Sequence, residues 1–346
     1  MSTTTISSQS VSKWLGKWYK SLIRHQLQEA TGWKVKVDGQ IMDMEEDQTL
    51  LIYYSLLTLR HNLLTRQENP NNYLKSINPF EEKSGPMLTH YYHLFTGMCE
   101  ALEGNYTEAL RHYSAAEEYL DKIPDDKEKA EFHFRVANVY YHIRQTSLAF
   151  KHGKEAKAIF DVDPDYLQRS AHCEILLGLC YLTNKDFELA QDHLETALDI
   201  AIQLNSDNLK IHIRYNFGFL FAEKGDSRQA IEHLEMVDAV DFDKAATSFL
   251  LAREFFKTGR LDDAFNKVNQ GMEVCEKTEN TEYQHHFKIL KAFHDGSSVE
   301  NIETAVKEGV AYFKKHQLYG YADDYLTKLA NYVCENNDYR NTDVFF

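Results

Sequence analysis

Histidine and cysteine are the residues of this chain best suited to bind metals or act as nucleophiles. The sixteen histidines are scattered over 346 residues, and the five cysteines include no CxxC pair. Adjacent His285 and His286 would point to different faces of a helix, so we expect a surface helix there. Cys173 and Cys180, seven residues apart, fit one buried helix face. We therefore expect a reducing compartment, no disulfide framework and no metal ligand.

The common motifs of catalysis and nucleotide binding are absent from the sequence as well. It contains no GxSxG, HExxH, GxxxxGK[ST] or GxGxxG motif. A net charge of −15 argues against general nucleic-acid binding, which requires clustered Lys and Arg. The N-terminus lacks the apolar stretch of a signal peptide, and the longest apolar run, Leu50–Leu59, is too short to span a bilayer. We expect a cytoplasmic protein with no membrane and no direct nucleic-acid partner.

The elements that must position any site divide into two parts by charge. Residues 1–66 carry a net charge of +2 and residues 67–346 a net charge of −17. Residues 67–86, at this boundary, hold three of the five prolines. This shift predicts a domain at 1–66, a linker at 67–86 and a second domain at 87–346. Apolar residues at helical spacing predict helices from Trp14 and from about Asp47. Residues 33–41 alternate partly like a strand, but a lone strand would have no partner, so we expect a three-helix bundle.

A repeat runs through residues 87–346. Five segments place a small residue twelve positions before an alanine, and the successive alanines are 40, 41, 40 and 34 residues apart. The pairs are Gly97/Ala109, Ala137/Ala149, Gly178/Ala190, Gly218/Ala230 and Ala252/Ala264. Small residues let two antiparallel helices approach closely, and a glycine seven positions later permits the turn between them. The pattern predicts an all-α fold with a tetratricopeptide superhelix of about seven helix pairs. Its register stops inside the last pair, so we expect the chain to continue beyond Phe346 or its end to fray.

Such a superhelix by itself predicts a binding protein whose concave surface receives a peptide or a helix. The charge of −17 favours a peptide with Arg or Lys, and it is equally typical of a solvated surface.

Three segments resemble the Rap proteins, the response-regulator aspartate phosphatases of spore-forming Gram-positive bacteria. They are Met44–His61, similar to the third helix of that family, Lys129–Thr146, similar to its second repeat, and Tyr215–Gly218. The resemblance implies a three-helix bundle, a flexible linker and about seven repeats. It also implies one of two activities: dephosphorylation of a sporulation-relay response regulator, or sequestration of the DNA-binding domain of a competence activator. A short secreted and re-imported peptide would inhibit either activity by drawing the bundle onto the repeats.

The resemblance selects Gln48 as the catalytic residue, with Asp47 and Leu51 beside it as partner-binding residues. A glutamine amide can orient a water in line with the labile aspartyl phosphate, so this chain needs no nucleophile and no cofactor. Any Mg²⁺ would belong to the response regulator. Taken alone, a glutamine in the first turn of a helix would simply be exposed.

For the peptide, the resemblance selects Asn216, whose amide can pair with an extended backbone. Asn216 could instead cap or bridge adjacent repeats. Tyr141, His142 and Thr183 are the other expected peptide contacts. Family members often carry an acid at the position of Thr183, so this chain would prefer a different peptide or bind weakly.

Three readings follow: a peptide-regulated phosphatase, a non-catalytic anti-activator, and a scaffold or transcription factor. Of the third, the transcription factor is disfavoured because residues 47–64 are too apolar for a recognition helix in a major groove.

Overall fold

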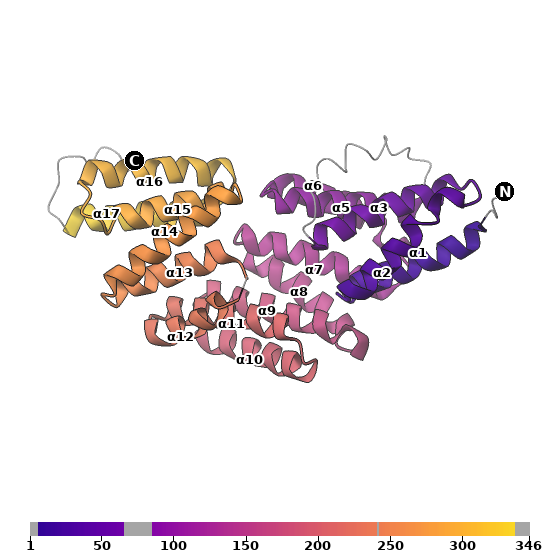
Figure 1. Ribbon diagram of the computed structural model, residues 1–346, viewed down its shortest axis with the longest axis horizontal. Coiled ribbons are helices and arrows are strands. Elements are labelled where there is room, and N and C mark those ends of the chain that lie inside the picture. Colours follow the sequence, from indigo (N-terminus) through magenta and orange to yellow (C-terminus); the bar gives the residue numbers. More distant parts are fainter. Residues whose placement is uncertain (1–5, 66–84, 241, 336–346) are drawn as a thin grey trace. The chain divides into compact units, whose positions relative to one another are not determined.

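The computed structural model describes residues 6–65, 85–240 and 242–335, and these residues form helices joined by short turns (Figure 1). In this described part, extended pairing is limited to one isolated bridge between Ile6 and Met44. The predicted all-α fold is therefore confirmed. None of the helices described is long and apolar enough to cross a membrane.

The N-terminal bundle consists of three helices, as predicted. They are α1 (Ser8–Ile23), α2 (Leu27–Asp38) and α3 (Gln48–Thr65). On α1, the residues at helical spacing, including Leu15, Trp18 and Leu22, are fully buried. The indole of Trp18 donates a hydrogen bond to His61 Nδ1 on α3 at 3.2 Å, so the polar edge of this large side chain is satisfied inside the bundle.

Antiparallel helix pairs follow the bundle. They are α5 (Pro86–Leu102) with α6 (Tyr106–Glu117), α7 (Asp126–His142) with α8 (Thr146–Phe160), α9 (Leu167–Thr183) with α10 (Phe187–Gln203), α11 (Asp207–Lys224) with α12 (Ser227–Asp238), α13 (Lys244–Lys257) with α14 (Leu261–Lys277) and α15 (Thr281–Ala292) with α16 (Val299–Lys315), before α17 (Tyr319–Glu335). The small residues have the predicted role. A Cβ on Gly97 would lie 2.5 Å from the ring of Tyr113, and one on Gly218 would lie 2.5 Å from Leu234. The paired helices are therefore packed too closely at these positions for any side chain.

The turns between paired helices also share one geometry. Gly104 and Gly225 adopt φ of 77° and 85°, in the left-handed region that glycine enters without strain. Arg144 and Lys185 occupy the corresponding positions of the two intervening pairs, with φ of 59° and 60°. The turn is thus set by the repeat itself, and glycine is favoured there without being required.

The contacts divide the chain into two compact units. The first contains residues 1–141 and 147–176, so the bundle shares a unit with the first repeats. The second contains residues 142–146 and 177–346, with a core of apolar residues from α12 to α15 such as Leu251, Val268 and Phe287. The predicted boundaries at 66 and 86 stay predictions, because residues 66–84 lie outside the described residues. The expectation for the end of the chain also falls outside them.

Candidate functional site

The beginning of α3 presents the residues expected to bind the partner. Asp47 Oδ1 accepts a hydrogen bond from the backbone N–H of Leu50 at 3.1 Å, so Asp47 caps the helix. Gln48 is the first residue of α3 and is exposed, whereas Leu51 is half-buried. The carboxamide of Gln48 is therefore accessible to solvent on a backbone that the cap holds in place. The roles assigned to these three residues stay predictions.

The second half of α3, from Leu56 to Leu63, is buried. It includes Arg60, which belongs to a cluster of charged side chains. We call Glu131 of α7 and the three arginines around it the Glu131 cluster. Arg60 Nη2 lies 3.0 Å from Glu131 Oε1, and Arg135 Nε lies 2.8 Å from the same oxygen. Arg169 of α9 pairs with the other carboxylate oxygen, Oε2. A single carboxylate thus holds together helices α3, α7 and α9 within the first unit.

Three of the four side chains of the Glu131 cluster are shielded from water, and the fourth, Arg135, is 20% exposed. The side chains of Arg60 and Glu131 are 0% exposed and that of Arg169 is 1% exposed. Burial alone would raise the pKa of Glu131, but the surrounding arginines outweigh it and hold that pKa well below its usual range. Burial lowers the pKa of Arg169 to about 10. Burial, reinforced by Arg169, also lowers the pKa of His25, which pairs with Arg169 Nη1 as a neutral ring at 2.9 Å.

A group of tyrosines lies beside this cluster and encloses a second acid. Tyr53 of α3 stacks on Tyr91 of α5 with ring centroids 5.8 Å apart, and Tyr19 of α1 packs on Tyr91 at 5.2 Å. The hydroxyl of Tyr91 donates a hydrogen bond to Glu128 of α7. Burial raises the pKa of Glu128 to about 7, although the Tyr91 hydrogen bond opposes this shift. Tyr19 and Tyr53 of the bundle therefore pack on α5, whose Tyr91 bonds to an acid of α7 with a pKa near neutrality.

This titration predicts a pH-dependent stability. The pKa of Glu128 in the folded state lies above its ordinary value of 4.5. The folded state is therefore most stable at low pH, where Glu128 is protonated, and it loses stability as pH rises from about 4.5 to about 7. We expect Glu128→Gln to match the wild type near pH 4 and to be more stable by about 3 kcal/mol at pH 8. Urea unfolding at both pH values measures this difference. The exposed Glu118→Gln serves as the control, and a Glu128→Gln effect independent of pH would contradict the assignment.

The predicted peptide residues of the second unit are held by their own helices. Asn216 is 3% exposed, and its amide nitrogen donates to the carbonyl of His212 at 2.8 Å. The hydroxyl of Thr183 donates to the carbonyl of Leu179 at 3.0 Å. Asn216 keeps its carbonyl oxygen and a second N–H for other partners. Its contribution to peptide binding stays a prediction.

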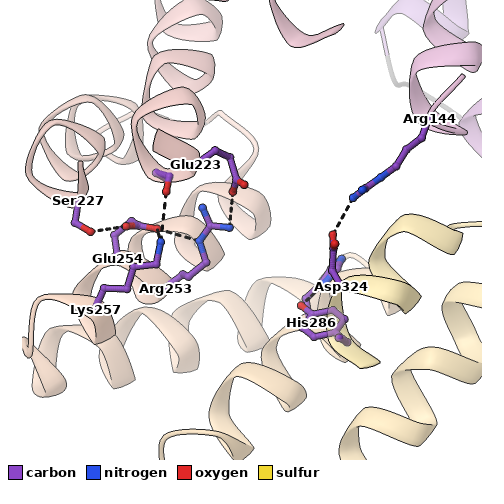
Figure 2. A network of polar contacts seen from close by, with 10 residues as sticks. Arg144, Glu223, Ser227, Arg253, Glu254, Lys257, His286 and Asp324 are labelled. Atoms are coloured by element: carbon purple, nitrogen blue, oxygen red, sulfur yellow. Dashed lines mark hydrogen bonds and ion pairs between the residues drawn. The ribbon is translucent and has the colours of Figure 1, made fainter. Parts of the chain in front are cut away.

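Figure 2 shows an ionic network of α11, α12 and α13 that sequence reasoning missed. The carboxylate of Glu254 is fully buried and accepts from Ser227 Oγ at 2.7 Å, Lys257 Nζ at 2.8 Å and Arg253 Nε at 3.0 Å. Arg253 also reaches Glu223 at 2.9 Å. The network joins residues 27 and 30 positions apart in the chain, so no local motif signals it. It links α11, the helix that carries Asn216, to α13.

The remaining predicted residues have the following positions. Tyr141 is half-buried and His142 is exposed, both at the end of α7 where the two units meet in the sequence. Cys173 and Cys180 are buried on α9, as predicted. The prediction for His285 and His286 was wrong in part. His286 is 3% exposed and pairs with the hydroxyl of Tyr325 at 2.7 Å, because α17 covers this face of α15 (Figure 2).

Comparisons with known proteins agree with this architecture. Residues 5–66 match the family described as response regulator aspartate phosphatase H, N terminal, and residues 170–237 match the tetratricopeptide repeat. Regulatory protein RapG of Bacillus subtilis (strain 168) is 33% identical over 75% of this chain and 73% of its own length. Response regulator aspartate phosphatase H of the same organism is 30% identical over 92% and 88%. The crystal structure of a Rap protein complexed with competence and sporulation factor superposes with a TM-score of 0.86, at 27% identity, over 96% of this chain and 94% of that one.

Proposed function

Because this chain belongs to the Rap family of response regulator aspartate phosphatases, we propose that it binds a bacterial response regulator and dephosphorylates its aspartyl phosphate. The bundle would contact the regulator, with Asp47 and Leu51 beside the reacting group. The observation that carries the proposal is the exposed Gln48, which begins α3 directly after the capping Asp47 in the family-matched segment.

The chemistry needs a positioned water and no nucleophile on this chain. The oxygen of the water attacks phosphorus, and the bond from phosphorus to the aspartyl oxygen breaks. The products are inorganic phosphate and the free aspartate carboxylate of the regulator. The Gln48 oxygen accepts a hydrogen bond from the water, and its N–H can donate to a phosphoryl oxygen, which aligns the attack. Mg²⁺ held by the regulator would neutralise charge on the phosphoryl group.

The direct test measures loss of phosphate from a phosphorylated sporulation-relay response regulator with and without this protein. We expect this protein to accelerate the loss when it is present in amounts well below those of the regulator. Equal rates with and without it would contradict a phosphatase acting on that substrate.

We further propose that a short signalling peptide regulates this protein. The structure at 27% identity is a complex with competence and sporulation factor, which supports a peptide as the ligand. Asn216, Thr183, Tyr141 and His142 are the residues proposed to contact it. A peptide that is secreted and re-imported would meet this protein in the cytoplasm, where we place it.

Replacing Asn216 by alanine tests this peptide role. We expect at least about a tenfold loss in affinity for labelled competence and sporulation factor, because two backbone hydrogen bonds would be lost. Fluorescence anisotropy measures the affinity. Asn138→Ala is the matched control, since the Asn138 amide likewise donates to a carbonyl of its own helix, that of Phe134, at 2.7 Å. Equal losses for both variants would show that Asn216 acts only through the fold.

A second candidate function is an anti-activator that binds the DNA-binding domain of a competence-type regulator. The observation in its favour is the charge of −17 over residues 67–346, which would attract a basic DNA-binding domain. This function requires binding without hydrolysis. Retained inhibition of regulator–DNA binding by a Gln48→Ala variant would separate it from the phosphatase.

A further inference from the structure

A cluster of three potential metal ligands lies between the paired helices α7 and α8 in the first unit. His133 on α7 faces His152 and Glu155 on α8, and one ligand atom from each lies within 4.8 Å of the others. The sequence concealed this cluster, because His133 and His152 are 19 residues apart on different helices. We propose that His133, His152 and Glu155 bind a divalent transition-metal cation, with Zn²⁺ as the best fit to two imidazoles and a carboxylate.

The distances between the donor atoms match those of a metal site. His133 Nδ1 lies 2.9 Å from His152 Nδ1 and 3.2 Å from Glu155 Oε2, and His152 Nδ1 lies 3.8 Å from that oxygen. Ligands about 2.0 Å from a tetrahedral Zn²⁺ are about 3.3 Å from one another. The three separations lie around this value, so small rotations of the side chains would complete the geometry.

The surroundings hold these ligands in place and leave one side accessible. His133 and His152 are 17% and 11% exposed, and the ring of Tyr140 stacks on His152 with centroids 5.8 Å apart. The Glu155 side chain is 41% exposed, so water can occupy a fourth position.

The two histidines also satisfy each other without a metal. Two Nδ1 atoms at hydrogen-bond distance require that one carries a proton and the other a lone pair. On binding a cation, the ring that carries the Nδ1 proton would take the other tautomer, with its proton on Nε2, and both neutral imidazoles would then offer an Nδ1 lone pair.

The preceding repeat contains a natural comparison for this site. His93 and His112 occupy the corresponding positions, with their Nδ1 atoms 3.0 Å apart. The residue that corresponds to Glu155 there is Ala115. A histidine pair is therefore part of the packing in both repeats, and the carboxylate of Glu155 is what adds the third donor. We expect the cation to bind at His133 and His152 and not at His93 and His112.

The test titrates the full-length chain, without a histidine tag, with Zn²⁺ and with Co²⁺. A Cys334→Ser background removes the exposed thiol. We expect one cation per chain, the visible absorption of tetrahedral Co²⁺, and a higher melting temperature with Zn²⁺. Glu155→Ala and His152→Ala should each weaken binding by at least about tenfold, whereas His112→Ala, which removes the same packing one repeat earlier, should leave it unchanged.

Two results would overturn the proposal. One is the absence of stoichiometric binding by the parent chain. The other is a Glu155→Ala variant that binds as tightly as the parent. Circular dichroism of each variant confirms that it is folded, so a loss of binding can be assigned to the missing ligand.

Discussion

Gln48→Ala is expected to slow dephosphorylation of the response regulator by about 100-fold, because the attacking water is then no longer held in line with the phosphorus–oxygen bond that breaks. Gln48 is exposed at the first position of α3, and Asp47 provides the cap, so the substitution leaves both the cap and the core of the bundle intact. Affinity for the regulator should therefore change by less than about threefold. Phosphate release and binding to the regulator, measured side by side, separate the two effects.

Gln9→Ala is the matched control for Gln48→Ala. Gln9 is also an exposed glutamine in the first turn of a bundle helix, here α1. We expect it to retain wild-type phosphatase activity. If Gln48→Ala were as active as Gln9→Ala, Gln48 would have no part in catalysis, and sequestration of a DNA-binding domain would become the leading proposal.

Glu131→Ala is expected to destabilise the first unit by about 3–5 kcal/mol, because it leaves buried Arg60 and Arg169 without an anion. Since Arg60 belongs to α3, the loss should reach the bundle as well as the repeats. Hydrogen exchange should show faster exchange along Leu56–Leu63, and urea unfolding should give a lower midpoint. Because the pKa of Glu131 is low in the folded state, Glu131 stabilises the protein at every pH above the ordinary carboxyl pKa. This stabilisation is lost only as pH falls below that ordinary value.

Glu108→Ala provides the contrast to Glu131→Ala. Its partner Arg111 lies at 2.7 Å, but the two side chains are 51% and 63% exposed. Solvent screens such a pair, so we expect a change below about 0.5 kcal/mol. A Glu131→Ala variant as stable as Glu108→Ala would show that the buried cluster contributes no net stability. A Glu131→Gln variant, which keeps the shape of the side chain but not its charge, would then decide whether charge matters.

Much of the architecture could be predicted because its signals are local. Gly97 and Gly218 lie where paired helices touch, and a fixed offset to the following alanine reveals them at each repeat. The turn of each pair follows from the same register, even where Arg144 and Lys185 replace glycine. The prediction for His285 and His286 was wrong in part because it considered one helix alone, and α17 covers His286.

The helical repeats, the bundle and the segment that begins α3 with Asp47 and Gln48 could all be predicted from the order of the residues. Each of these depends on spacing within one or two helices, which a periodic pattern records. Where charge is buried and which side chains meet could be seen only in the folded chain. Glu131 gathers Arg60 from 71 positions earlier and Arg169 from 38 positions later, and His133 meets His152 across a helix pair. Such contacts depend on how helices pack together, and no spacing along the chain specifies that packing.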